Sequence, residues 1–216
     1  MQNETINSRF FALRMSHMSL LLFFCTIFFG IFFLSGCSDS PKSYSLSDFM
    51  AEDQSFAYPE LSWGINASEV QDKLGCTLTR FPEETVEESL DTYTGTLYAS
   101  THVDFAGRSC KLGFQFDNGK LWAASVFTED PVQNNKSSVQ DFSNLIEEAR
   151  RIWGAESEAI ENGSVSDPEI APEPYLYSSY RWEHDDENGK TMAIISAVYI
   201  SESEYNLSLD ISKPLK

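Results

Sequence analysis

The sequence has few basic residues. Its 216 residues include 15 Lys and Arg against 33 Asp and Glu, which gives a formal charge of −18. A nucleic-acid-binding protein must neutralise phosphates with Lys and Arg, and electrostatic docking on anionic lipid also needs basic side chains. We therefore predict no nucleic-acid partner. The acidic excess is typical of a solvated surface, and a cationic partner or a divalent ion is the alternative interpretation.

Sequence motifs for catalysis and cofactor binding are also missing. The chain contains no Gly-x-Ser-x-Gly, no His-Glu-x-x-His and no phosphate-binding glycine loop. Only His102 and His184 follow the N-terminal region, and the acidic turn at 185–189 lacks the ligand spacing of a calcium loop. We predict a protein that is not an enzyme, with no catalytic residues, cofactor or metal site. Two carboxylates of a hydrolase could still meet in space.

A long apolar run is present near the N-terminus. Residues 18–34 carry no charge, and Arg9 and Arg14 precede them against one acid, Glu4. A basic flank followed by an apolar segment is typical of a secretory signal. The alternative is an uncleaved membrane helix, although about 17 residues is at the short end of what crosses a bilayer.

The run ends in Leu34-Ser35-Gly36-Cys37, which resembles the lipobox of bacterial lipoprotein precursors. The resemblance implies a lipoprotein signal peptide over 1–36 and a mature protein that begins at an acylated Cys37. It further implies an extracytoplasmic protein that is lipid-anchored to the cell membrane, or to the outer membrane in a Gram-negative host. The membrane is then a partner through the anchor at Cys37.

Cysteine is scarce in the predicted mature chain. Cleavage before Cys37 would leave 180 residues with a formal charge of −19, since the removed segment holds two basic residues and one acid. Cys25 would leave with the signal, so Cys76 and Cys110 remain as a disulfide candidate in an oxidising compartment. Such a bond would close a loop of about 35 residues and stabilise the fold by roughly 3–4 kcal/mol. The sequence contains no Cys-x-x-Cys pair, so it does not favour a zinc site.

The mature chain divides into a tether and two halves. Residues 37–56 contain Ser, Asp and Pro with few apolar positions, which predicts a flexible tether. A capped helix is expected over 67–74, with Asn66 as N-cap, Glu69 as its capping-box partner and Gly75 at the C-terminal end.

The remaining elements follow from periodicity and turn residues. Strands are expected at 93–105, 111–116 and 121–127, a short helix or loop at 82–91, a helix that is capped by Ser137 or Ser138 and ends at Trp153, an acidic loop at 156–174, and strands at 176–183, 191–200 and 205–212.

The element order repeats at an offset of about 80 residues, because Gly75 and Gly154 end the two expected helices. We therefore predict an α+β fold built from two α-β-β-β repeats, 57–130 and 131–216, with helices packed on one face of an antiparallel sheet.

The start of the first half also carries a family resemblance. Gly64, Ser68, Val70, Leu74 and Gly75, followed by Tyr- and Phe-rich strands, resemble the helix opening of SmpA/BamE-type envelope lipoproteins and of tandem-repeat β-lactamase inhibitory proteins. The resemblance implies a non-catalytic module whose sheet presents a face to another protein. It assigns no site residue.

Aromatic residues are the best candidates for an interaction surface, since Trp and Tyr often anchor interfaces. We select Trp122, Tyr180 and Trp182, of which the last two share one face of a strand. The predicted function is a membrane-anchored, non-catalytic lipoprotein that binds an unidentified envelope protein through its sheet. The alternative is a cell-surface hydrolase or solute-binding protein with a carboxylate-lined cleft.

Overall fold

The computed structural model describes residues 41–80, 86, 89–165, 175–187 and 189–214. Eleven strands form one mixed sheet in this part of the chain. The strands are β1 (Lys42–Tyr44), β2 (Leu78–Thr79), β3 (Gly95–Ala99), β4 (Val103–Phe105), β5 (Arg108–Asp117), β6 (Lys120–Thr128), β7 (Val132–Gln133), β8 (Glu158–Val165), β9 (Tyr175–Asp186), β10 (Gly189–Ser201) and β11 (Glu204–Ser212).

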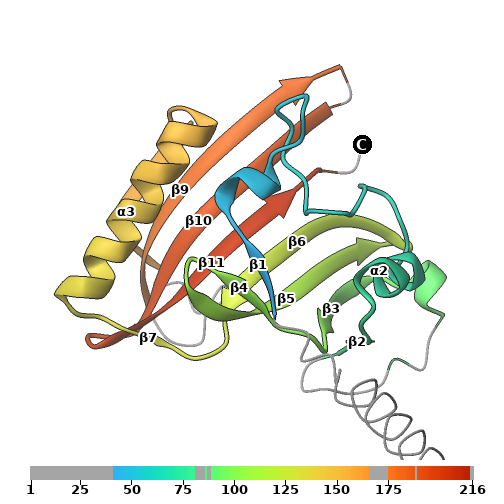
Figure 1. Cartoon of the computed structure of the whole chain (residues 1–216), viewed down its shortest axis with the longest axis horizontal. Helices are drawn as coiled ribbons and strands as arrows, with labels where there is room; N and C mark the ends of the chain where they lie inside the picture. The colour runs from blue at the N-terminus through green and yellow to red at the C-terminus, as the bar shows by residue number, and fades with distance from the viewer. Residues whose placement is uncertain (1–40, 81–85, 87–88, 166–174, 188, 215–216) are drawn as a thin grey trace, which may run out of the picture. The chain divides into compact units, whose positions relative to one another are not determined.

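The long strands are antiparallel neighbours in the centre of the sheet. The order is β1-β4-β5-β6-β11-β10-β9-β8, with β2 beside β3, β3 beside β5, and β7 beside β11. Strands β6 and β11 join the two halves of the chain (Figure 1), and their register places Ser125 opposite Asp210. Only β1 runs parallel to its partner, β4, which makes the sheet mixed.

Helix α2 (Ala67–Leu74) has the bounds expected from its caps. The Asn66 side chain accepts a hydrogen bond from the Glu69 amide at 2.9 Å, and the Glu69 carboxylate accepts one from the Asn66 amide at 3.0 Å. Gly75 ends the helix with a φ of 64°, a left-handed conformation that favours glycine. The local sequence alone therefore specifies this helix.

Helix α3 (Lys136–Trp153) ends where the sequence predicts, but the expected cap at Ser137 or Ser138 is wrong, because the helix starts two residues before the earliest start that those caps allow. Its N-cap is Asn135, whose side chain accepts hydrogen bonds from the amides of Ser137 and Ser138. Leu145, Ile146 and Ala149 are buried on one side of the helix, and charged residues occupy the other. This amphipathic pattern packs α3 along β9 and β10 (Figure 1).

Residues 42–61 form part of the core, so the prediction of a flexible tether over 37–56 is wrong from residue 42 onward. The short helix η1 (Leu46–Phe49) places Leu46 and Phe49 at 2% and 0% exposure, and the Phe49 ring meets Phe105 edge-on at 5.8 Å. The apolar residues here are isolated between polar ones in the sequence, but the rings of Tyr44, Phe49 and Tyr58 pack against one another in the core. Residues 37–40 lie outside the described part of the chain.

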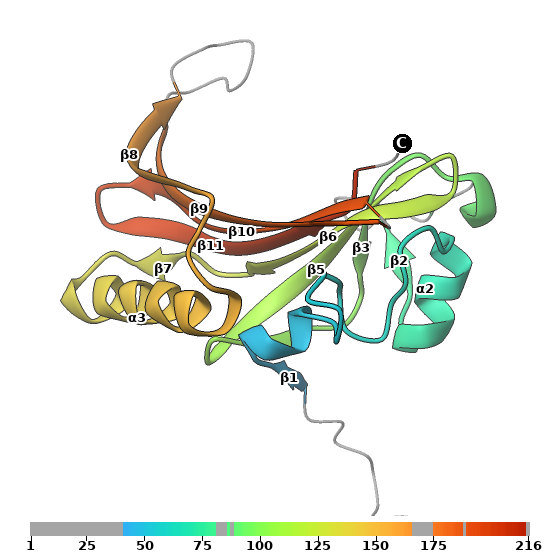
Figure 2. The ribbon, with the colours of Figure 1, turned by 90° about the horizontal axis from the view of Figure 1, so that it is seen from above.

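The helices cover one face of the sheet. Seen from above, α2, α3 and η1 all lie on the same side of the long strands (Figure 2). The fully buried side chains of Trp182, Ile195, Leu209 and Phe114 lie on this covered face. The opposite face of β5, β6, β11, β10 and β9 carries no helix among the described residues, and we call it the open face.

The predicted fold class is wrong. The structure is mostly β, with eleven strands in a single mixed sheet and only two α-helices in the described ranges, so it is not an α+β fold of two α-β-β-β repeats. Short strands β1, β2 and β7 arise in segments without alternating apolar residues. Strand β8 occupies Glu158–Val165, inside the expected acidic loop; it forms because β9 offers a long pairing partner.

Two sequence-based expectations fall partly outside the described residues. Of the expected acidic helix or loop at 82–91, the structure describes residue 86 and a short helix, η2 (Leu90–Thr92). The strand expected at 93–105 is two strands, β3 and β4, separated by a bend.

Candidate functional site

Alternation along the strands sorts side chains between the two faces. In β10, Ile195 and Ala197 are at 0% and 1% exposure on the covered face. Their neighbours Ile194 and Ser196 point to the open face and are partly exposed. The open face therefore differs from the covered face both in its residue types and in the solvent exposure of its side chains.

A groove of about 500 Å³ crosses the open face. Its walls include the aromatic side chains of Trp122, Tyr175 and Tyr177, which come from β6 and β9. Serines from neighbouring strands, Ser125, Ser179 and Ser196 among them, line the space between these rings. Small side chains flanked by large ones leave a depression in the surface, and this is what shapes the groove.

Trp122 reaches the groove through an irregularity in the sheet. Gln115 pairs with Ala123 and Phe116 pairs with Leu121, so Trp122 is an extra residue in β6. Such a bulge re-aims a side chain relative to regular alternation. Trp122 was selected from the sequence as an interaction candidate, and its position in the groove wall leaves it accessible to a partner.

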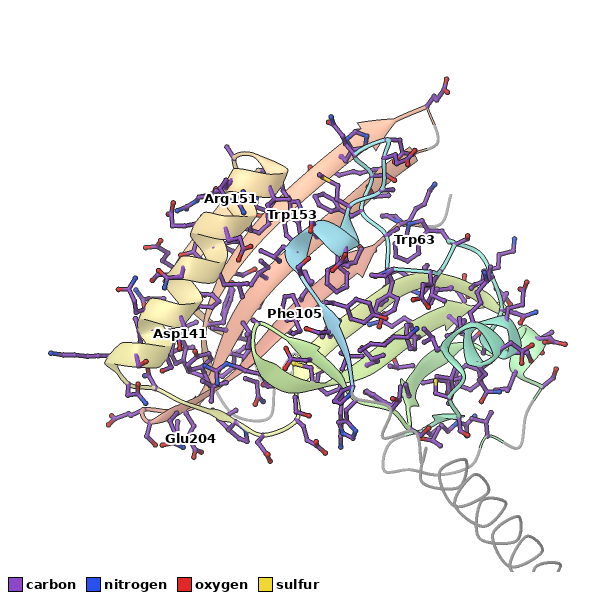
Figure 3. All side chains as sticks on the ribbon, viewed as in Figure 1. Trp63, Phe105, Asp141, Arg151, Trp153 and Glu204 are labelled. Atoms are coloured by element: carbon purple, nitrogen blue, oxygen red, sulfur yellow. The ribbon has the colours of Figure 1, made fainter. Side chains whose placement is uncertain are left out.

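The other three tryptophans are structural. The indole N–H of Trp63 donates to the Phe56 carbonyl at 3.1 Å, and that of Trp153 donates to the Leu46 carbonyl at 3.2 Å. Figure 3 shows Trp153 at the end of α3 beside η1. Among the described residues, no such hydrogen bond is found for the Trp122 indole.

Tyr180 and Trp182 share one face of β9, as the alternation predicts, but that face is the covered one. Trp182 is 2% exposed, donates its indole N–H to the Gly154 carbonyl at 2.9 Å, and meets the Trp153 ring edge-on at 5.3 Å. Tyr180 is 8% exposed and donates its hydroxyl to Glu161 at 2.8 Å. Both residues hold α3 on the sheet, so their selection as interaction candidates is corrected.

The groove contains a partly buried carboxylate, Asp210 of β11. Ser125 donates its hydroxyl to Oδ1 at 2.5 Å, and Ser208 donates to Oδ2 at 3.0 Å. Burial raises the pKa of the Asp210 carboxyl, and the two serine hydrogen bonds act in the opposite direction. No ion pair to Asp210 is found in the described part of the chain.

Other charges near this face are neutralised by neighbours. Arg181 forms ion pairs with Glu158 at 2.8 Å and with Glu183 at 3.2 Å. Across the sheet, Glu129 pairs with Lys111 at 3.1 Å and with His102 at 2.9 Å, and these contacts lower the pKa of the Glu129 carboxyl. Asp210 differs from these residues because its hydrogen-bond partners are neutral hydroxyls.

The sequence contained a signal for Asp210 that we did not use. Ser208-Leu209-Asp210-Ile211-Ser212 alternates polar and apolar residues, with Leu209 and Ile211 buried. Strand alternation therefore places both serines and the aspartate on one face. One acid among 33 has no distinguishing feature until the register of β6 brings Ser125 beside it.

A second groove of about 540 Å³ adjoins the first near the start of β9. The two grooves share Val165 and Tyr175. The second also contains Leu176 and Ile200, which are 53% and 50% exposed. Leu176 alternates with Tyr175 and Tyr177 and pairs with Tyr199, which packs against the core. The second groove is therefore lined mainly from the covered face and meets the first at Val165 and Tyr175.

The predicted disulfide is not formed. Both Cys76 and Cys110 are free thiols, Cys110 in the core and Cys76 half-buried after α2. Burial raises the pKa of both thiols, in the case of Cys110 to about 11. The lipidation candidate Cys37 lies outside the described residues, as does the whole expected signal peptide.

The described residues contain neither a cluster of metal ligands nor a helix that could span a membrane. No group of three or more His, Cys, Asp and Glu is placed to hold a metal ion there. No helix in the same ranges has the length and apolar character needed to cross a membrane. Comparison with protein-family models, curated proteins and solved structures found no match.

Proposed function

We propose that the protein is a lipid-anchored, extracytoplasmic binding protein without catalytic activity, and that it binds another envelope component through the open face. The observation that carries this proposal is the groove between Trp122 and Tyr177 on a sheet face without helices. Exposed aromatic rings around a depression are typical of binding surfaces.

The chemistry of the groove supports binding over hydrolysis. Two-carboxylate hydrolysis needs a pair of acids about 5–10 Å apart, whereas Asp210 is the single acid among the described residues that line the groove. The hydroxyls of Ser125 and Ser208 are oriented toward this carboxylate, where they donate hydrogen bonds.

The proposed lipid anchor at Cys37 is inferred from the sequence. Leu34-Ser35-Gly36-Cys37 follows an uncharged apolar run, and basic residues precede that run. Stable membrane attachment requires at least two acyl chains, and a diacylglycerol on Cys37 supplies them.

A photo-crosslinking experiment in native membranes tests binding through the open face. A photoreactive amino acid replaces Ser196 on the open face in the full-length chain. The matched control replaces Ser143, an exposed serine of α3. We expect a discrete adduct of defined mass from position 196 and none from position 143. Equal labelling from both positions, or no adduct from either, would contradict the proposal.

The anchor is tested separately with the Cys37→Ser variant. We expect the unmodified chain to sediment with membranes and its mature N-terminus to carry the mass of a lipid. The variant should lose both the lipid and the membrane association. A mature N-terminus at another residue would overturn the anchor without affecting the binding face.

A further inference from the structure

The Asp210 carboxylate has no counter-charge in the described part of the chain. Its two oxygens accept hydrogen bonds from Ser125 and Ser208, and no cation pairs with it among the described residues. Nearby Arg181 and Lys111, in contrast, each contact a glutamate. A carboxylate in a partly buried place loses hydration, and hydrogen bonds from neutral hydroxyls replace only part of it.

The hydrogen bonds at Asp210 leave room for a further donor. A carboxylate has about four lone-pair positions, and the two serines occupy one on each oxygen. An alkylammonium group is a compact charge with rotatable donors, so it can use a remaining position on either oxygen. A guanidinium group pairs most strongly through two parallel hydrogen bonds to both oxygens, which fits this arrangement less well.

The shape of the groove favours an extended occupant. The groove of about 500 Å³ is lined by residues of β6, β11, β10, β9 and β8, so it extends across five neighbouring strands and past Asp210. Tyr177 and Ile194 supply apolar surface beside the carboxylate. The aliphatic stem of a lysine packs on such surface while its ammonium group reaches a polar site.

The charge of the whole chain favours the same kind of occupant. A formal charge of −18 attracts a basic partner from a distance, and the attraction raises the association rate. Long-range attraction does not choose a site. The Asp210 carboxylate, which has no counter-charge among the described residues, supplies the local contact that selects the groove.

We infer that the groove binds an extended, basic peptide segment of a partner protein, and that one lysine ammonium of this segment pairs with Asp210. This inference rests on the proposed function and names the chemistry of its partner. Tyr175, Tyr177 and Trp122 then contact the rest of the segment, and the serines of the groove donate and accept hydrogen bonds with its backbone.

A titration of the full-length protein in detergent tests the ammonium contact. The probes are a penta-lysine peptide and the same peptide with every side chain acetylated, at near-physiological salt. We expect binding of the first and none of the second. Asp210→Asn should weaken binding about tenfold or more, because it removes one partner of a desolvated charge pair. Asp130→Asn removes the same charge from an exposed loop and should leave binding unchanged.

Three results would overturn the inference. Equal weakening by Asp210→Asn and Asp130→Asn would show diffuse attraction only. Binding of the acetylated peptide would exclude an ammonium contact. Competition by spermidine at the same concentration as the peptide would assign the site to a free amine. Any of these, combined with a crosslinked partner at position 196, leaves the proposed function standing while this inference fails.

Discussion

Tyr177 and Tyr180 lie three residues apart in β9 and have different surroundings. Tyr180 faces α3, where its ring packs at 6.0 Å from Phe142 and its hydroxyl donates to Glu161. Tyr177 faces the other way and lines the groove. One strand therefore supplies an aromatic residue to the core and another to a partly exposed surface.

The two faces differ in how their tryptophan side chains are held. On the covered face, indole N–H groups donate to backbone carbonyls, as Trp182 does to Gly154. On the open face, the Trp122 indole N–H makes no such hydrogen bond among the described residues. The Asp210 carboxylate accepts hydrogen bonds from serines but has no counter-charge in the same part of the chain. Groups that a fold leaves incompletely paired are available to a ligand, so the open face is the better candidate for function.

Arginine substitution at two adjacent positions of β10 should give the largest difference in stability between the two faces. Ala197 is 1% exposed under α3, so Ala197→Arg buries an unpaired charge and should destabilise the fold by more than about 4 kcal/mol. Ser196→Arg extends onto the open face and should cost about 0.5 kcal/mol or less. Urea unfolding followed by circular dichroism measures both. Comparable losses would remove the distinction between the faces.

Truncating one tryptophan on each face gives the next largest difference. Trp182→Ala removes a buried ring and its hydrogen bond to Gly154, with an expected loss of about 3–5 kcal/mol. Trp122→Ala removes a partly exposed ring and should cost about 1 kcal/mol or less. The same unfolding measurement applies. A large loss at Trp122 would make it a core residue and count against its role in binding.

Local sequence signals were sufficient where an element depends on its own residues. Asn66, Glu69 and Gly75 specify α2 through contacts within one short segment. Strand β8 was missed because Glu158–Val165 is polar and mostly exposed, with Asn162 at a φ of 52°. Its structure comes from pairing with β9, which a local pattern does not contain.

The site was predictable only in part for the same reason. Alternation places Tyr180 and Trp182 on one face, but it does not say which face α3 covers. Trp122 was selected for its size, whereas its position depends on an irregular pairing with β5. Asp210 becomes distinctive only when Ser125, 85 positions away in the chain, donates to it.

The covered face also depends on an ion pair at its margin. Arg150 lies over the Tyr180 ring at 5.7 Å, and its guanidinium donates to both oxygens of Glu156. Glu156→Gln should destabilise the fold by about 1 kcal/mol. The exposed Glu147 contacts the same arginine, and Glu147→Gln should cost less than about 0.5 kcal/mol.

The Glu156 effect has a defined dependence on pH. The hydrogen bonds from Arg150 lower the pKa of the Glu156 carboxyl to about 2 from an ordinary 4.5. Its stabilisation is therefore present above pH 4.5 and is lost as the pH falls toward 2. Unfolding free energies of the unmodified protein and of Glu156→Gln should converge over that interval. A constant difference would mean that packing, not charge, explains the loss.

Asp210→Asn should have a small effect on stability, with the opposite sign. Burial raises the pKa of this carboxyl, so the folded state holds its proton more tightly than the unfolded state does. The associated stability is present below the ordinary pKa of 3.8 and is lost as the pH rises through the raised value. At neutral pH the asparagine variant should therefore be more stable than the unmodified protein.

The pH profile separates this explanation from a change in packing. Well below pH 3.8 the aspartate is neutral in both states, so Asp210→Asn and the unmodified protein should have the same unfolding free energy. The difference in unfolding free energy between Asp210→Asn and the unmodified protein should grow as the pH rises. Asp130→Asn, at an exposed position, should show no such difference. A gain in stability at neutral pH together with weaker binding of penta-lysine would mean that the open face retains a charge the fold itself does not need. A loss of stability at neutral pH would make Asp210 a structural residue and leave the groove without its proposed contact.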